Sequence, residues 1–455
     1  MNKIVISVCL LIQPLYTSAQ QRSVSIKEAL AMVANSQPQV EAYEHRSQAA
    51  SYGVKMARNS LMPELVAGYQ AGYATYNNIT GMSYPGFILP ISGPPSSGNV
   101  YDPVAGSAVG AIVKWNPLTF GQRQAAVEKA TMQFKLAGSS ANEAIFRQQY
   151  LVILTYLDAV YLQKLLQSYQ SNIDRTRVGL EQSLVFAKEG LRPGIDTIQF
   201  RSVLAQTQTD LLTAQQQYYR QLAELLRLTA MAGKPDEVLL TDTLLISQQP
   251  TGVAVMDTIT AHPLFQYYQA KRDLSEAALK EVQRSWRPKL DIWANAYARG
   301  SGVAADGSVH SADGWSLTRR NYGAGIQLSF PILQFSQVNL QKQQYRSLLK
   351  ADEAQLKQVT LDLQTQQETA QFNYNQSLEI AKQSLVQSAA ARFAFDGLKL
   401  SYQSGLTDFT RLIQGQYDLL KAETAEADAA IRVWRSLLEL AVANGNLELF
   451  ITKLK

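Results

Sequence analysis

The sequence has a single cysteine, Cys9, and three histidines among its 455 residues. Cys9 lies in an apolar run between Lys3 and Thr17-Ser18-Ala19, a pattern typical of a secretory signal peptide over residues 1–19. We therefore expect a mature chain without cysteine, which excludes disulfides, thiol catalysis and cysteine metal sites. No histidine lies in a metal-binding or nucleophile motif. We predict no catalytic residue, no metal and no cofactor, and the chain is not expected to be an enzyme.

Charge and long hydrophobic runs are also scarce. Charged residues make up 17% of the chain, with 42 Lys and Arg against 37 Asp and Glu. No basic segment alternates with aromatics, which argues against nucleic-acid binding. After the signal peptide, no stretch reaches the ~20 apolar residues of a membrane-spanning helix. Any membrane crossing by this exported chain must therefore use strands.

What the sequence does contain is an internal duplication. The segment from Ser60 to Leu65, around Pro63, is matched by the segment from Ser285 to Leu290, around Pro288, a shift of 288 − 63 = 225 residues. A repeat of this length indicates two structurally equivalent halves. We assign residues 20–229 to the first repeat, 230–254 to a linker and 255–455 to the second repeat. Further matched pairs are Gln37-Pro38 with His262-Pro263, Phe120-Gly121-Gln122 with Phe335-Ser336-Gln337, and Gly190-Leu191 with Gly405-Leu406.

Helical periodicity dominates both halves. A capping box of Ser25 and Glu28 opens a predicted helix over 25–61 that is broken or kinked at Pro38, and 258–287 is its counterpart. Residues 120–189 and 335–404 have almost no Gly or Pro and predict coiled-coil-like rods about 100 Å long. Turns at 190–196 and 405–408 lead to helices over 197–229 and 409–444, which Asp196 and Asp408 can cap. We interpret the carboxylates Glu423, Glu426 and Asp428 as a solvated helix face.

Four segments alternate apolar and polar residues: 64–76, 106–117, 288–299 and 321–331. Such strands suit a sheet with lipid on one face and water on the other, although a soluble sandwich would show the same alternation. Tyr69, Tyr73, Tyr76, Trp115, Trp293, Tyr297 and Tyr322 are candidates for aromatic girdles. The candidate lipid-facing residues are Leu65, Ala67, Tyr69, Ala111, Val113, Trp115, Ile292, Ala294, Ile326 and Leu328.

Four strands cannot close a barrel alone, because the smallest bacterial barrels need about eight. Three copies of the chain would supply about twelve strands. The loops over 77–103 and 300–318, rich in Gly or Pro, are predicted to face outside the cell.

Taken in order, these parts resemble the TolC family of outer-membrane efflux channels. The resemblance rests on Leu61-Met62-Pro63-Glu64-Leu65, Arg287-Pro288-Lys289-Leu290, Trp115-Asn116-Pro117-Leu118, Phe330-Pro331-Ile332-Leu333 and the two glycine turns. It implies an α+β membrane protein, internally duplicated, whose four transmembrane strands join a trimeric twelve-stranded barrel in the outer membrane. A long antiparallel α-helical coiled-coil barrel would continue it into the periplasm. The implied partners are two further copies, outer-membrane lipid, a periplasmic adaptor and an inner-membrane pump.

The resemblance also implies roles at the hairpin tips. Asp196 and Tyr402 match positions that can hydrogen-bond and hold the entrance closed; alternatively, Asp196 only caps its helix and Tyr402 only packs on the rod. Arg411 and Gln414 stand where family members often place acidic residues. Gly190, Leu191, Gly405 and Leu406 are candidate adaptor contacts.

A different class of protein explains part of the sequence. A secreted coiled-coil scaffold, or a periplasmic adaptor without a barrel, would have the signal peptide and the rods. It leaves unexplained why both halves insert two phase-matched strands at the same place.

Overall fold

The structure is a computed structural model that describes residues 22–75, 98–99, 101–250, 259–304 and 306–454. The predicted signal peptide, Tyr76, most of loop 77–103 and the end of the 230–254 segment lie outside the described residues. The chain divides into two compact units. We call 48–136 with 270–353 the sheet unit, and up to 47 with 137–269 and 354–455 the helical unit. Among the described residues, no helix combines the length and the apolarity needed to cross a membrane.

The helices repeat in matched pairs. α2 (Pro38–Asn59) and α5 (Pro263–Arg284) have 22 residues each, and α4 (Ile195–Thr229) and α7 (Phe409–Ala443) have 35 each. The long helices α3 (Gln122–Lys188) and α6 (Phe335–Gln403) have 67 and 69 residues. A short α8 (Glu448–Ile451) follows α7. With the strands described below, these pairs confirm the α+β fold class and the internal duplication.

The first predicted helix is divided in two. α1 (Ile26–Ser36) opens with the capping box of Ser25 and Glu28, which is confirmed. Gln37 is extended, with φ −80° and ψ 115°, because a residue before proline is disfavoured in the helical region. The break at Pro38 therefore falls where the sequence predicts it.

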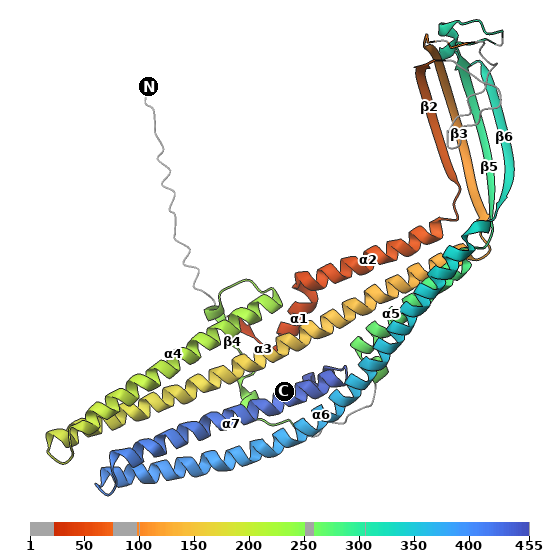
Figure 1. Cartoon of the computed structure of the whole chain (residues 1–455). Coiled ribbons are helices and arrows are strands. Elements are labelled where there is room, and N and C mark those ends of the chain that lie inside the picture. The colour runs from red at the N-terminus through yellow and green to blue at the C-terminus, as the bar shows by residue number, and fades with distance from the viewer. Residues whose placement is uncertain (1–21, 76–97, 100, 251–258, 305, 455) are drawn as a thin grey trace, which may run out of the picture. The chain divides into compact units, whose positions relative to one another are not determined.

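Four antiparallel strands form the sheet of the sheet unit, in the order β2-β3-β5-β6 (Figure 1). They are β2 (Glu64–Ala74), β3 (Val104–Leu118), β5 (Lys289–Ser301) and β6 (Arg319–Ser329), close to the four predicted segments. Each half of the chain contributes one hairpin, and β3 pairs with β5 across the duplication. Within the described residues, β2 and β6 are edge strands that pair on one side only.

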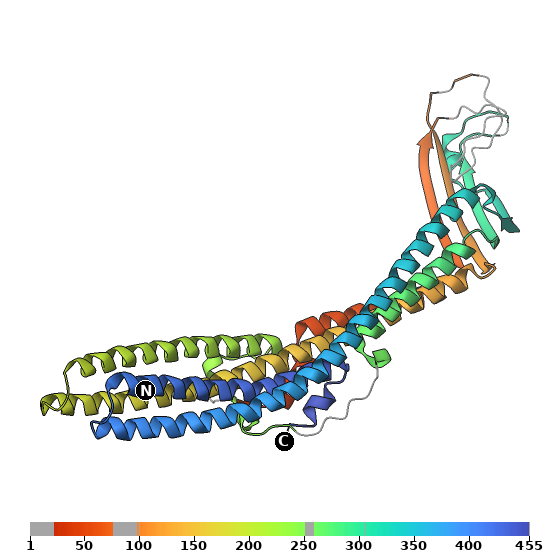
Figure 2. The same cartoon turned by 60° about the horizontal axis from the view of Figure 1, so that its bottom comes forward.

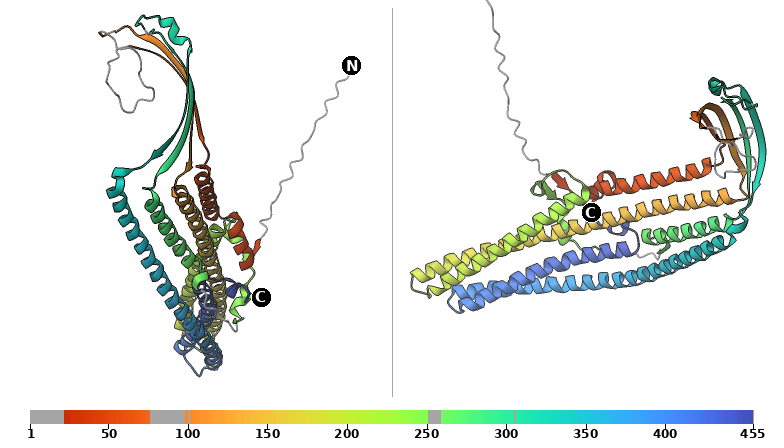
Figure 3. Two further views of the ribbon diagram at one scale, coloured as in Figure 1. Left: turned by 90° about the vertical axis from the view of Figure 1, so that its right-hand side faces the viewer. Right: turned by 45° about the horizontal axis from the view of Figure 1, so that its top comes forward.

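The helical unit places its long helices in the order α4-α3-α7-α6 (Figure 1), and Figures 2 and 3 show the same helices from other sides. Antiparallel contacts join α3 to α4 and α6 to α7; for example, the ring of Phe200 lies against Gly179 and Leu398 lies against Gly415. α3 and α7 meet in the middle, where Arg175 pairs with Glu423. This order leaves α4 and α6 as the outer helices of the unit.

The 230–254 segment is more than a linker. It contains β4 (Val238–Leu240), which pairs in parallel with β1 (Arg22–Val24), and it buries Leu240 and Leu245 in the main hydrophobic core. The hydroxyl of Tyr156 ties these pieces together: it donates to the Val24 carbonyl at 2.8 Å and accepts from the amides of Thr241 and Asp242. These three-residue strands are too short to give a periodic signal in the sequence, and they find each other only through the core.

The residue before the helix proline has the same role in each half. Gln37 Nε2 donates to the Leu228 carbonyl at 2.9 Å, and His262 Nε2 is 3.0 Å from the Val442 carbonyl. Both carbonyls lie in the last turn of a long helix, where the donor four residues ahead is missing. The Val442 carbonyl accepts from the Gly445 amide as well, at 2.8 Å. His262 Nδ1 accepts from the Leu264 amide, so Nε2 carries the proton. Burial lowers the pKa of His262, which favours this neutral form.

Candidate functional site: a two-faced sheet and the helix-hairpin tips

The strand register places all ten candidate lipid-facing residues on one face of the sheet. Residues paired directly across antiparallel strands share a face, and the rows run, for example, Leu65–Val113–Ala294–Ala324. All ten are exposed except Ile292, which is partly exposed. Trp115 lies at the helix end of this face, and its indole N–H donates to the Leu61 carbonyl at 2.8 Å. We call this surface the apolar face.

The opposite face, the polar face, contains Lys114, Asp291, Asn295 and Gln327. Trp293 and Tyr297 also lie on it, because they alternate with Ile292 and Ala296. Placing these two rings in an aromatic girdle on the apolar face was therefore wrong. The ring of Trp293 lies instead over Gly323 and Gly325 of β6, and a Cβ on Gly325 would collide with it at 2.8 Å.

A polar hollow of about 1010 Å³ lies where the polar face meets the start of α3. Lys114, Lys289, Asp291, Trp293 and Arg123 are among the residues that line it. These charged and amide side chains favour contact with water, because a polar group that is buried without a hydrogen-bond partner costs free energy. The two faces of the sheet therefore suit different solvents.

The strand-to-helix junction beside this hollow is held by arginines. Phe120 and Gly121 both have positive φ, at 47° and 90°. Arg287 Nη1 donates to the Phe120 carbonyl at 2.8 Å, and Arg284 Nη1 donates to that of Gly121 at 3.2 Å. Side chains from the end of α5 and the turn after it thus satisfy the carbonyls of the turn that begins α3.

Both hairpin tips use the same glycine geometry. Gly190 and Gly405 have φ values of 68° and 79°, in the left-handed region that glycine adopts without strain. The following amides of Leu191 and Leu406 donate back five residues, to Phe186 and Ser401, as in a Schellman turn. Leu191 is 68% exposed and Leu406 is 83% exposed. Two leucines therefore project from the ends of the helical unit.

Asp196 and Tyr402 are brought together behind the tips. The Tyr402 hydroxyl donates to Asp196 Oδ2 at 3.1 Å, and Tyr402 and Asp196 are 1% and 9% exposed. Burial and the Asp196 carboxylate raise the pKa of Tyr402 to about 12, so the hydroxyl keeps its proton. Asp196 does not cap α4, since Gly194 occupies the N-cap without a side-chain bond. Asp408, by contrast, caps α7 by accepting from the Arg411 amide at 2.9 Å.

Arg192 joins the two tips, a contact that the sequence analysis missed. Its Nη2 donates to the Thr407 carbonyl at 2.7 Å, and its guanidinium lies 5.0 Å from the ring centre of Tyr402. The sequence shows an arginine beside the first glycine turn, but it does not show which residue that arginine contacts. The second tip, which holds Thr407, is about 200 residues away in the sequence.

Arg411 and Gln414 lie apart from this contact. Both are exposed on α7, and Gln414 donates to Asp418 Oδ1 at 3.1 Å on the same helix. They share a helix face with Asp418 and Lys421, one and two turns beyond Gln414. The structure therefore does not bring them to Asp196 and Tyr402.

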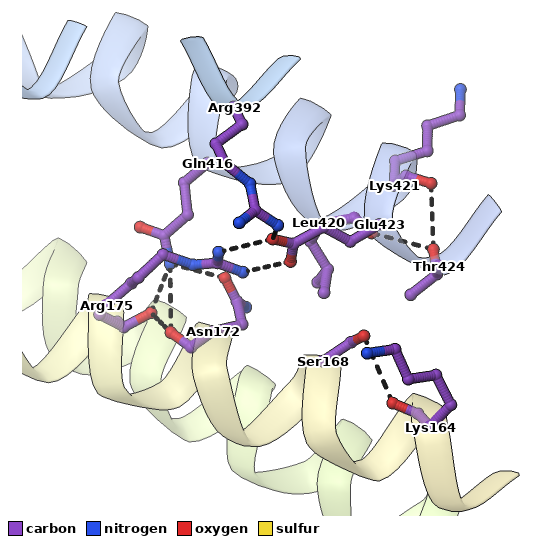
Figure 4. A network of polar contacts seen from close by, with 11 residues as sticks. Lys164, Ser168, Asn172, Arg175, Arg392, Gln416, Leu420, Lys421, Glu423 and Thr424 are labelled. Carbon is purple, nitrogen blue, oxygen red and sulfur yellow. Dashed lines mark hydrogen bonds and ion pairs between the residues drawn. The ribbon is translucent and has the colours of Figure 1, made fainter. Parts of the chain in front are cut away.

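A buried polar network lies further along the helical unit, between α3 and α7 (Figure 4). Glu423 is 11% exposed and binds Arg175 at 2.7 Å and Arg392 at 3.0 Å. Gln416 donates to the Asn172 side chain at 2.9 Å. Interpreting Glu423 as part of a solvated face was wrong, because the packing of α3 onto α7 cannot be seen in the sequence of α7 alone.

Part of the chain is similar in sequence to a known protein family, and most of it is similar in fold to solved structures. Residues 29–231 match the model of the family described as outer membrane efflux protein. This stretch of the chain is therefore similar to outer membrane efflux proteins. The similarity supports an efflux-channel role, and no curated protein with which the chain was compared matches it.

Solved structures extend the likeness over most of the chain. The outer membrane protein VceC from Vibrio cholerae is 13% identical, with a TM-score of 0.73 over 92% of this chain and 96% of its own. CusC, studied for transmembrane channel formation, is 11% identical, with a TM-score of 0.76 over 95% and 96%. The Campylobacter jejuni outer membrane channel CmeC is 12% identical, with a TM-score of 0.73 over 92% and 85%. At these identities the likeness shows the fold.

Proposed function

We propose that three copies of this chain assemble into an outer-membrane channel that forms the exit duct of a tripartite efflux or type I secretion system. The duct is a passive conduit that extends into the periplasm, carries out no chemistry and opens and closes at the hairpin tips. A periplasmic adaptor and an inner-membrane pump deliver the cargo.

The sheet supports the assembly. Its register gives an apolar face and a polar face, and both edge strands, β2 and β6, offer backbone groups for pairing with a further strand. Backbone groups in a bilayer must all be paired, so a four-stranded sheet is stable there only when copies join edge to edge and close. This sorting of residues by register is the observation that carries the proposal.

The outer helices support it independently. On α4, Ile198, Leu212 and Tyr219 are exposed at multiples of seven residues. On α6, Val386, Phe393 and Leu400 are exposed at the same heptad spacing. Exposed heptad stripes on the two outer helices favour packing of α4 of one subunit on α6 of the next. Such a head-to-tail contact closes into a ring when its rotation allows.

The tips fit the entrance of such a duct. The Asp196–Tyr402 bond and the Arg192 contact hold the two hairpins of one subunit together, which we assign to the closed state. Gly190, Leu191, Gly405 and Leu406 form the projecting surface, which we assign to the adaptor contact.

Extraction and conductance test the proposal together. The mature protein should stay in the outer-membrane fraction through a carbonate wash, leave it in detergent, and form ion-conducting channels in planar bilayers. Release by carbonate or salt without conductance would instead fit the secreted coiled-coil scaffold or a periplasmic adaptor.

A further inference from the structure

The short 3₁₀ helix η4 (Ser311–Trp315), in the connection between β5 and β6, lies on the apolar face of the sheet at its loop end. Ser107 and Gly300, paired in register on β3 and β5, lie beneath it, and Ser107 is four residues from Ala111 on the same face. The Ser107 hydroxyl donates to the Gly314 carbonyl at 2.6 Å, and a Cβ on Gly300 would lie 2.6 Å from that carbonyl oxygen. Small residues on the two strands therefore make room for η4 against the sheet.

η4 brings a tryptophan to this face. The ring centres of Trp315 and Tyr73 are 5.4 Å apart, with 74° between the ring planes, and both side chains are exposed. Tyr73 on β2 is paired in register with Ala105, two residues from Ser107, and so belongs to the apolar face. Indole and phenol rings have an apolar body and a polar tip, so they favour the boundary between lipid tails and water.

The same short helix also carries a charge. Asp313 is exposed, two residues before Trp315. A carboxylate is costly in the hydrocarbon core of a membrane, whereas the apolar body of an exposed indole ring is better placed against apolar groups than in bulk water. The headgroup layer, where tryptophan and tyrosine are enriched in membrane proteins, is the environment that suits both side chains.

A second aromatic side chain marks the other end of the apolar face. Trp115 lies on β3, 115 − 105 = 10 residues from Ala105, the register partner of Tyr73. Ten residues span about 33 Å of strand, or about 25 Å of depth for a strand tilted by about 40°. The apolar band of outer-membrane barrels is about 25 Å tall. The spacing of the two aromatic positions therefore matches one bilayer, with exposed Val109 and Val113 between them.

On β6 the apolar face also ends in amphipathic side chains. Tyr322 is exposed, and Arg320 is the next residue on this face toward the loop. An arginine can extend its apolar stem along such a surface and keep its guanidinium group among headgroups or water. The apolar residues Ala324, Ile326 and Leu328 lie on the helix side of Tyr322.

We propose that Trp315 and Tyr73 form a contact site for the lipid headgroups of the outer leaflet, and that η4 covers the outer end of the apolar face. The inference rests on the proposed function, because a sheet closed into a membrane barrel exposes this face to lipid. Part of the loop 300–318 then lies against the membrane instead of projecting into the surrounding water.

Depth-dependent quenching of tryptophan fluorescence tests the inference. The detergent-extracted protein is reconstituted in phosphatidylcholine vesicles whose lipids carry bromine either near the headgroup or near the end of the acyl chain. The emission that Trp315→Phe removes should be quenched about twofold more by the shallow bromine than by the deep one. Trp293→Phe is the matched control: Trp293 lies on the polar face, so the emission that it contributes should be quenched by neither lipid.

A second variant protects the test from misfolding. Trp315→Tyr removes the same emission but keeps an amphipathic ring against Tyr73, and it should give the same emission difference as Trp315→Phe. Emission from Trp315 that neither lipid quenches, or that the deep bromine quenches as much as the shallow one or more, would overturn this inference alone. A wild-type protein that does not insert into the vesicles would overturn the proposed function as well.

Discussion

Two buried polar contacts at the residue scale hold parts of the helical unit in place: Tyr402 with Asp196, and His262 with Val442. In each contact, a side chain donates a hydrogen bond to an oxygen atom of another helix in a buried position. Their loss has different consequences, because only the first lies at the proposed entrance.

Removing the Asp196–Tyr402 bond should favour an open entrance. A buried hydrogen bond to a carboxylate is worth about 1.5 to 3 kcal/mol. We predict that Asp196→Ala combined with Tyr402→Phe raises single-channel conductance in planar bilayers. Tyr417→Phe, at an exposed tyrosine on α7, should leave it unchanged. Equal conductance in wild type and both variants would mean that Asp196 and Tyr402 only pack the helices.

His262 should make stability depend on pH. Its folded pKa lies below the unfolded value of about 6.5, so the neutral form is stabilised by folding. Stability should therefore be complete above about pH 6.5 and fall as the pH drops from there through the folded pKa. His262→Gln can still donate to the Val442 carbonyl, as Gln37 does to Leu228, and should remove this part of the pH dependence. Denaturant midpoints measured from about pH 7.5 to about pH 5 check it; identical slopes in both proteins would contradict it.

At the element scale, the packing of α3 on α4 requires a glycine where the Phe200 ring of α4 lies against α3. A Cβ on Gly179 of α3 would lie 2.4 Å from the Phe200 ring of α4, whereas a Cβ on Gly138 of the same helix meets nothing within 4 Å. Close helix packing behind the tips thus requires glycine at one of these positions only.

We predict that Gly179→Ala lowers the free energy of unfolding by about 1 to 3 kcal/mol through overpacking. Gly138→Ala is the matched control and should be neutral or stabilising by up to ~1 kcal/mol, because alanine favours the helix. Thermal unfolding of both variants measures the difference. A Gly179→Ala protein as stable as Gly138→Ala would show that Phe200 moves freely.

The faces of the sheet give a second element-scale test. We predict that Ala111→Arg, on the apolar face, costs about 2 to 4 kcal/mol near the membrane midplane and impairs assembly. Lys114→Gln, on the polar face of the same strand, should be tolerated. Assembly is followed by the yield of detergent-extracted oligomer, and equal tolerance at both positions would reject the assignment of the faces.

The sequence predicts an element well when its pattern lies within a short stretch of the chain, and poorly when the element depends on a contact between distant segments. Alternation over about ten residues located β2, β3, β5 and β6, and local turn chemistry located Gly190, Gly405 and the Asp408 cap. Contacts between distant segments were out of reach: the β1–β4 pair, the Arg192 bridge between tips and the burial of Glu423 all depend on which segments meet. Asp196 shows the ambiguity directly, since an acidic residue after a turn suits both a cap and a tertiary bond.

At the scale of the whole molecule, the duplication explains why one chain supplies two hairpins of strand and two of helix. Strands β2 and β6 lie at the edges of the sheet, and helices α4 and α6 are the outer helices of the helical unit, so each presents groups that a second copy can pair. The division into repeats 20–229 and 255–455 and the roles of the candidate residues stay predictions until assembly is measured.

Native mass spectrometry of the detergent-extracted mature protein tests the assembly most directly. Closing four strands per chain into one barrel requires a defined number of copies, and we predict a trimer that persists at low protein concentration. A mature protein that is a monomer in water, with no need for detergent, would contradict the proposed channel.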